Sequence, residues 1–241
     1  MDTVYLDNAA TTCMRPEVLE AMLPYFCEEY GNPSSIYDLG QEASDAVARS
    51  RKTIAEAIGA QGKEVYFTAS GTEADNWAIK GFMRANATKG KHIITSAIEH
   101  HAVLHSCQAL EKEGFEVTYL PVNGEGLVSV DDFEAAIRPD TILATIIFAN
   151  NEIGTIQPIR ELAVCAHAHG VTFHTDAVQA FAHEAIDVND LGIDMMSASA
   201  HKLYGPKGVG FLYIRKGLGV QNLIDGGQQE GGKRADRKSV V

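Results

Sequence analysis

The chain has 241 residues, a formal net charge of −12 and a hydrophobic fraction of 45%, enough for one large domain or two small ones. This acidic balance argues against a nucleic-acid partner, because phosphate binding needs a basic face, and it suits a protein that handles small molecules. No C-x-x-C pair occurs among Cys13, Cys27, Cys107 and Cys165, so we expect a reducing, cytoplasmic setting with neither a disulfide framework nor a zinc site.

The first third of the chain is dominated by helical patterns. Its opening residues lack the basic and apolar regions of a signal peptide. Pro16 stands where proline is favoured, near the first turn of a helix. Hydrophobic spacing and turn formers predict, in order, a helix over 15–30, a loop over 31–35, a helix over 41–60, a strand over 64–70 and a helix over 71–85.

Strands and helices alternate through the rest of the chain. Helices are predicted over 100–114, 131–137 and 159–170, and strands over 91–96, 115–121, 141–149, 171–177, 194–200 and 208–215. The longest apolar run, 142–149, is too short to span a bilayer. The alternation predicts an α/β fold, a mostly parallel sheet with helices on both faces. Ligands of such sheets bind at the carboxyl ends of the strands, so the loops after strands should carry the function.

Two of these loops carry residues that could bind a charged ligand, one an anionic group and the other a cationic group. Ser70 and Thr72 lie where a predicted strand gives way to a helix, and the amides and hydroxyls there could hold a phosphate. The same residues are also compatible with an ordinary helix cap, since Ser70 and Glu73 have capping-box spacing. Asp176 ends another apolar strand, where it could pair with a cationic ring nitrogen or cap a helix.

Two further loops contain paired polar residues. Asn150 and Asn151 follow the strand predicted over 141–149 and can donate and accept hydrogen bonds, although such a pair also favours a plain turn. His100 and His101 follow the strand over 91–96. Adjacent helical residues point in different directions, so a stacking or proton-transfer role for one histidine competes with a surface pair.

Lys202 connects these observations. It lies in "SASAHKLYGPKGVGF" (197–211), and a lysine whose pKa is lowered can form a Schiff base with an aldehyde cofactor. Pyridoxal phosphate needs such a lysine, an acid at its ring nitrogen, a phosphate site and a group against the ring. The loops supply candidates for all four: Lys202, Asp176, Ser70–Thr72 with Ser199 and His201, and His100. Gly205, Gly208 and Gly210 suit a tight turn or a close backbone approach.

The motifs together resemble those of a known family. "YLDNAATT", "GNPSS", "FTASGTEADNWAIKG", "IEHHAVL", "ANNEIGTIQPI", "HTDAVQA" and "SASAHKLYGPKGVGFLYIR" resemble cysteine desulfurases, the pyridoxal-phosphate enzymes of aminotransferase class V. The resemblance extends from residue 4 to about residue 235. It implies the large domain of a fold type I transferase, which releases sulfur from L-cysteine, leaves L-alanine and passes the sulfur to an acceptor for iron–sulfur cluster or thio-cofactor synthesis.

The resemblance also implies roles for individual residues. Lys202 matches the lysine that binds the cofactor, Asp176 the acid at the pyridine nitrogen, Gln179 the partner of the phenolic oxygen, and His100 the imidazole stacked on the ring that takes part in proton transfer. Thr72, Ser199 and His201 match phosphate contacts, Asn151 the asparagine beside the substrate carboxylate, and Asn8, Ala9 and Ala10 the segment lining the substrate pocket. No metal is implied.

The resemblance further implies a homodimer, with "GGQQEGGKRA" (226–235) near the subunit interface, and a sulfur-accepting or scaffold protein as partner. The chain departs from the family pattern after Ala235. We therefore expect residues 1–235 to form the cofactor-binding domain with its N-terminal segment and 236–241 to be an aberrant tail. We also expect the small C-terminal domain to be missing. The arginine that binds the substrate carboxylate and the cysteine that accepts the sulfur would be missing with it. Two alternatives stay open: another class V reaction, transamination or selenocysteine lysis, and an inactive fragment or partner subunit.

Overall fold

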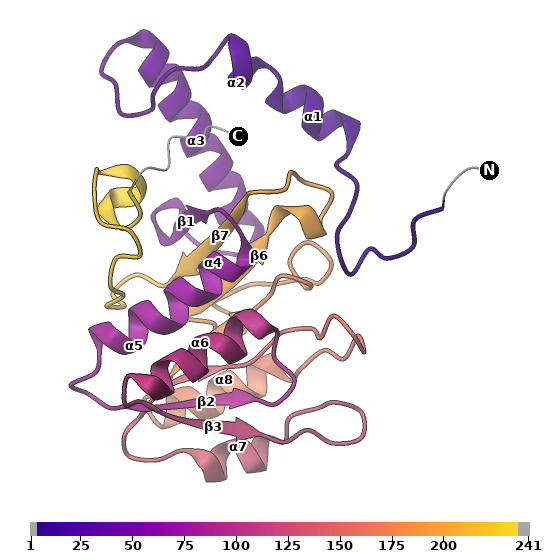
Figure 1. Cartoon of the computed structure of the whole chain (residues 1–241), viewed down its shortest axis with the longest axis vertical. Helices are drawn as coiled ribbons and strands as arrows, with labels where there is room; N and C mark the ends of the chain where they lie inside the picture. Colours follow the sequence, from indigo (N-terminus) through magenta and orange to yellow (C-terminus); the bar gives the residue numbers. More distant parts are fainter. Residues whose placement is uncertain (1–3, 236–241) are drawn as a thin grey trace.

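The computed structural model of the chain describes residues 4–235, so the segment 236–241, expected to be an aberrant tail, lies outside the described residues. Figure 1 shows the arrangement of its elements. The helices are α1 (Pro16–Met22), α2 (Pro24–Cys27), α3 (Asp38–Ala57), α4 (Gly71–Asn76), α5 (Phe82–Ala85), α6 (His101–Lys112), α7 (Val130–Ala136) and α8 (Ile159–Ala168). The strands are β1 (Val65–Thr68), β2 (His92–Ser96), β3 (Glu116–Leu120), β4 (Thr141–Thr145), β5 (Thr172–Asp176), β6 (Met195–Ser199) and β7 (Gly210–Ile214).

Within residues 4–235, seven strands form one sheet in the order β1-β7-β6-β5-β4-β2-β3. The pairs from β6 through β5, β4 and β2 to β3 are parallel, whereas β7 is antiparallel to both β1 and β6. The predicted mostly parallel α/β sheet is therefore confirmed. Because two antiparallel pairings restore the direction, β1 points the same way as β6.

This shared strand direction determines where the polar motifs of the sequence come together. The strands β1, β2, β4, β5 and β6 all end at the same edge of the sheet, and the loops that follow them carry the polar motifs of the sequence. The reversed strand β7 lies between β1 and β6 and pairs with both. In open α/β sheets the carboxyl edge is where ligands bind.

Helices cover both faces of the sheet (Figure 1). On one face, a core cluster includes Ala55, Phe133, Leu162 and Phe173, drawn from α3, α7, α8 and β5. On the other face, α4, α5, α6 and the turn between α4 and α5 supply a second cluster, to which the turn contributes Trp77. The strands buried between two such layers have apolar side chains on both faces, which explains the continuous apolar run of β4.

Two predicted helices differ from those in the structure. The helix predicted over 15–30 is wrong in extent, because α1 ends at Met22 and α2 begins at Pro24. Proline lacks the amide hydrogen that a continuous helix would use there. The helix predicted over 71–85 is helical throughout, but α4 and α5 are joined by a π-helical turn at Trp77–Gly81. Across residues 4–235, no helix combines the length and apolar character needed to cross a membrane.

The glycines after Lys202 have the geometry expected from the sequence. Gly208 has a φ of +83°, in the left-handed region that favours glycine. A Cβ on Gly210 would come within 2.6 Å of the Ala198 carbonyl oxygen and 2.8 Å of the Ser70 carbonyl carbon. Gly210 therefore lets β7 approach the loop that starts α4, which brings that loop close to β6.

Candidate active site

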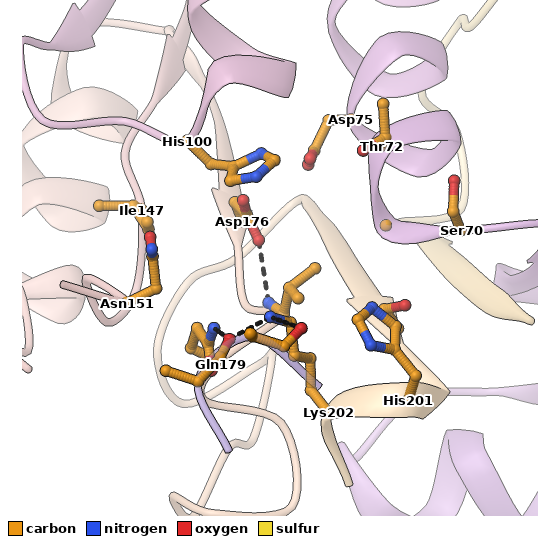
Figure 2. Close-up of a pocket in the computed structure, with 15 residues that line it drawn as sticks. Ser70, Thr72, Asp75, His100, Ile147, Asn151, Asp176, Gln179, His201 and Lys202 are labelled. Atoms are coloured by element: carbon orange, nitrogen blue, oxygen red, sulfur yellow. Dashed lines mark hydrogen bonds between the residues drawn. The ribbon is translucent and has the colours of Figure 1, made fainter. Parts of the chain in front are cut away.

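A pocket of about 360 Å³ opens at the carboxyl edge of the sheet, a size typical of small-molecule sites. Figure 2 shows its side chains converging from the loops after several strands. The lining residues are Ala9, Ala10, Ser70, Gly71, Thr72, Asp75, His100, Ile147, Asn151, Asp176, Val178, Gln179, Ser199, His201 and Lys202. The structure therefore brings together ten of the eleven residues to which the resemblance assigns roles, all except Asn8, which is exposed beside Ala9.

Lys202 ends a 3-10 turn, Ala200–Lys202, directly after β6. Its Nζ donates hydrogen bonds to the carbonyl oxygens of Ala9 and Ala10, the latter at 3.0 Å. Burial lowers the pKa of Lys202, and the charges of Asp176 and Asp7 partly oppose this effect. A lysine that loses its proton more easily than a surface lysine is a better nucleophile toward an aldehyde.

The N-terminal segment is fixed against the loop after β6. The Thr12 amide and Oγ1 both donate to the His201 carbonyl oxygen, at 2.9 and 2.8 Å, and the Tyr204 amide donates to Thr12 Oγ1 at 2.8 Å. Gln179 Nε2 adds a hydrogen bond of 3.0 Å to the Ala9 carbonyl oxygen. These contacts explain how residues almost 200 positions before Lys202 reach the same pocket.

Asp176 and Asp75 form a buried pair of carboxyls, with 4% and 1% of their surface exposed. Asp176 Oδ1 accepts the Val178 amide at 2.9 Å. Burial raises the pKa of Asp176, while the Val178 amide, His100 and Lys202 oppose the shift. Burial and the charge of Asp176 raise the pKa of Asp75 well above its ordinary value. Because Asp176 accepts the Val178 amide and lies near the charge of Lys202, we infer that it carries the negative charge and that Asp75 holds a proton.

His100 faces these two carboxyls across the pocket (Figure 2). One ring nitrogen of His100 and one carboxylate oxygen each of Asp75 and Asp176 lie within 4.8 Å of one another. His100 also caps α6, since its Nδ1 accepts the Ala102 amide at 3.1 Å. A neutral imidazole that accepts at Nδ1 carries its hydrogen on Nε2, so His100 can donate a hydrogen bond from Nε2.

The loop after β1 combines a helix cap with the pocket wall. Ser70 Oγ accepts the Glu73 amide at 3.1 Å, as the cap interpretation predicts. The Glu73 carboxylate pairs with Arg234, which ties the start of α4 to the segment 226–235. A Cβ on Gly71 would lie 2.5 Å from the Val178 Cγ2 atom, so glycine is required where α4 begins at the pocket.

The two asparagines after β4 serve different purposes. Asn150 is buried and structural: its Oδ1 accepts the amides of Glu152 and Ile153, and its Nδ2 donates to the Ile98 carbonyl oxygen. Asn151 lines the pocket, and its Nδ2 donates to Glu152 Oε1 at 2.7 Å. The turn interpretation thus holds for Asn150, and only Asn151 is placed to contact a ligand.

Sequence reasoning missed Asp75 and Glu99. Asp75 follows Gly71 by one helical turn, so a helix whose first turn faces the pocket also presents Asp75 to it. Glu99 is buried directly before His100, and its Oε1 accepts both the Ser96 hydroxyl at 2.5 Å and the Ile147 amide at 2.9 Å. Among residues 4–235, no hydrogen-bond partner contacts Glu99 Oε2. Burial raises the pKa of Glu99 from 4.5 to about 8.

The raised pKa of Glu99 predicts a loss of stability as pH rises. The folded state keeps a proton on Glu99 that the unfolded chain releases, so the contribution to the free energy of unfolding falls between pH 4.5 and about 8. Below pH 6.5 the buried His174, whose pKa is lowered to about 3, has the opposite effect. Between pH 6.5 and 8 we expect Glu99 to cost about 2 kcal/mol. In urea unfolding, the stability of the parent should fall more steeply with pH than that of Glu99→Gln, which keeps only the contribution of other groups such as Asp75; equal slopes would contradict the assignment.

The chain is similar to known proteins in both sequence and fold. The family described as Aminotransferase class-V matches residues 4–239. The chain is 57% identical over 238 residues to "Cysteine desulfurase IscS" of Clostridium botulinum (strain Hall) and 59% identical over 237 residues to the protein of the same name from Methanosarcina thermophila. These matches cover 99% and 98% of this chain but only 60% and 59% of the relatives. The chain therefore spans about 60% of the length of these curated relatives.

Solved structures give a matching result. The structure titled "NIFS-LIKE PROTEIN" superimposes with a TM-score of 0.96 at 40% identity, covering 98% of this chain and 66% of that one. The structure titled "SspA in complex with cysteine" has a TM-score of 0.94 at 45% identity, covering 96% of this chain and 67% of that one. The family expected from the motifs is thus confirmed, and so is the fold.

Proposed function

Because the chain belongs to the aminotransferase class-V family, we propose that its pocket binds pyridoxal 5′-phosphate through Lys202 and acts on L-cysteine as a cysteine desulfurase. The observation that carries the proposal is the meeting, in one pocket, of a lysine with a lowered pKa and the buried carboxyl of Asp176. The two relatives named above are both called cysteine desulfurase, which supports the substrate.

The chemistry of the pocket fits this cofactor. Burying a carboxylate such as Asp176 is costly unless a cation or several donors compensate it. A protonated pyridine nitrogen would supply that cation. The hydroxyls of Ser70, Thr72 and Ser199 and the ring of His201 line the same pocket and would hold the phosphate. Gln179 would contact the phenolic oxygen after giving up the Ala9 carbonyl.

When bound, pyridoxal phosphate supplies an electron sink for bonds at the substrate α-carbon. The groups that would act at the ring nitrogen and at the substrate α-carbon belong to this chain. Asp176 keeps the ring nitrogen protonated, because the negative charge stabilises a positive partner. Lys202 holds the cofactor and then moves a proton at the substrate α-carbon, for which its lowered pKa suits it. His100 lines the pocket with its Nδ1 engaged by the Ala102 amide, and it would take part in proton transfer through Nε2.

Substrate positioning is proposed for the remaining residues. Asn151 would contact the substrate carboxylate, and the segment of Asn8, Ala9 and Ala10 would line the substrate side, since the Ala9 and Ala10 carbonyls already contact Lys202. The residues 1–235 would form the cofactor-binding domain. The homodimer and the sulfur-accepting partner implied by the resemblance stay predictions, as does the cytoplasmic location expected from the cysteines.

Product analysis tests the proposed reaction. With an added thiol as sulfur acceptor, L-cysteine and two thiols give L-alanine, hydrogen sulfide and one disulfide. We expect the cofactor-loaded chain in D₂O to produce alanine that carries deuterium at the α-carbon, as followed by NMR. A keto acid in place of alanine would identify a transaminase instead. Unchanged L-cysteine without α-deuteration would contradict the proposal altogether.

A further inference from the structure

Three potential metal ligands meet on the surface where α7 packs against α8. Glu134 belongs to α7, Cys165 to α8, and His169 follows the last residue of α8. One ligand atom of each side chain lies within 4.8 Å of the other two, and His169 Nε2 is 3.7 Å from Glu134 Oε1. Cys165 is half-buried and the other two are exposed, so an ion could enter from solvent.

The ring of His169 is already oriented for a ligand. Cys165 and His169 are four residues apart and therefore share one face of the helix end. His169 Nδ1 lies 3.0 Å from the Cys165 carbonyl oxygen, which can only accept a hydrogen bond. In the neutral ring Nδ1 thus carries the proton, and Nε2, the atom near Glu134, has a free lone pair. Metal-binding histidines are commonly held by such a hydrogen bond from their other nitrogen to a backbone carbonyl.

We propose that Glu134, Cys165 and His169 bind a zinc ion. A thiolate and an imidazole favour zinc over magnesium or calcium, which prefer oxygen ligands. Zinc ligands at about 2.0–2.3 Å in tetrahedral geometry lie roughly 3.3–3.8 Å from one another. The present separations need only small side-chain rotations to reach that spacing. Three protein ligands leave the fourth position to water.

The position of this cluster separates it from the pocket. The strands β4 and β5 begin shortly after α7 and α8 end, so the C-terminal ends of both helices lie at the amino edge of the sheet. The pocket lies at the carboxyl edge. A bound ion would therefore join α7 to α8 and stabilise their packing, whether or not the pocket has the proposed function. The lack of a C-x-x-C pair conceals the site, because its ligands come from a Cys-x-x-x-His spacing and a separate helix.

Cobalt(II) provides a spectroscopic probe of the site, because a thiolate ligand gives a charge-transfer band in the near ultraviolet. All proteins in the test carry His100→Gln, which removes the imidazole of the group formed by Asp75, His100 and Asp176. We expect one equivalent of cobalt(II) to produce the band and zinc to displace it. Cys165→Ser should lose the band, whereas Cys27→Ser, a change at an exposed cysteine, should keep it.

Two further measurements keep the proposal testable. His169→Gln should weaken zinc binding at least about tenfold. Zinc should also raise the Tm of the protein with intact ligands and leave that of Cys165→Ser unchanged, because a ligand stabilises only the state that binds it. A band that persists in Cys165→Ser, or that never forms, would overturn the proposal and leave an ordinary surface ion pair between Glu134 and His169.

Discussion

Lys202→Ala is expected to abolish covalent cofactor attachment and to slow α-carbon chemistry on L-cysteine at least about a hundredfold. The variant loses the amine that would hold the cofactor and would move the substrate proton. In the parent, Lys202 Nζ donates hydrogen bonds to the carbonyl oxygens of Ala9 and Ala10, which lie outside the sheet. The sheet and its core should therefore persist in the variant. The measurements are the visible absorbance of the purified protein after incubation with pyridoxal phosphate and the rate of α-deuteration of L-cysteine.

Lys207→Ala is the matched control for this prediction. Lys207 lies in the same loop but is exposed and does not line the pocket. We expect the control to keep both the absorbance and the rate of the parent. Equal losses in the two variants would show that the loop as a whole, rather than the Lys202 amine, is needed for binding.

Asp176→Asn is the second large effect. The substitution preserves shape but removes the negative charge that a protonated pyridine nitrogen would meet. A charge-assisted hydrogen bond is worth about 1.5–3 kcal/mol, so we expect the dissociation constant of pyridoxal phosphate to rise about ten- to hundredfold. The rate of α-proton exchange should fall as well, because a neutral ring withdraws electrons less strongly. Equilibrium dialysis and NMR measure the two effects.

Asp75→Asn separates charge from burial. Asp75 is as deeply buried as Asp176 and lines the same pocket, but we infer that it is already protonated. Its replacement by a neutral amide should therefore change cofactor binding less than threefold. If Asp75→Asn weakened binding as much as Asp176→Asn, the assignment of the charge to Asp176 would be wrong.

Much of this fold can be predicted from local pattern. All seven strands between residues 4 and 235 lie within predicted runs, because strands buried on both faces are continuously apolar and are bounded by turn formers. The order of the strands and the reversed direction of β7 could not be predicted this way. They depend on pairings between segments as distant as β1 and β7, for which the sequence pattern carries no local signal.

The site residues also divide into those that the sequence pattern predicts and those that it does not. Asp176, His100 and Lys202 stand out because polar residues that follow buried strands collect at the carboxyl edge. Ala9 and Ala10 carry no chemistry of their own, and only the family resemblance indicated them. Asp75 and Glu99 were missed because their importance comes from burial, which a helix interior or a short loop does not reveal in sequence.

The most direct test of the proposed function is the location of the cofactor on the chain. The purified protein should be incubated with pyridoxal phosphate, reduced with borohydride, digested and examined by mass spectrometry. We expect the reduced adduct on the peptide that contains Lys202, at the residue that lines the pocket. An adduct on Lys207 alone, or one scattered over exposed lysines with none at Lys202, would contradict the assignment of Lys202.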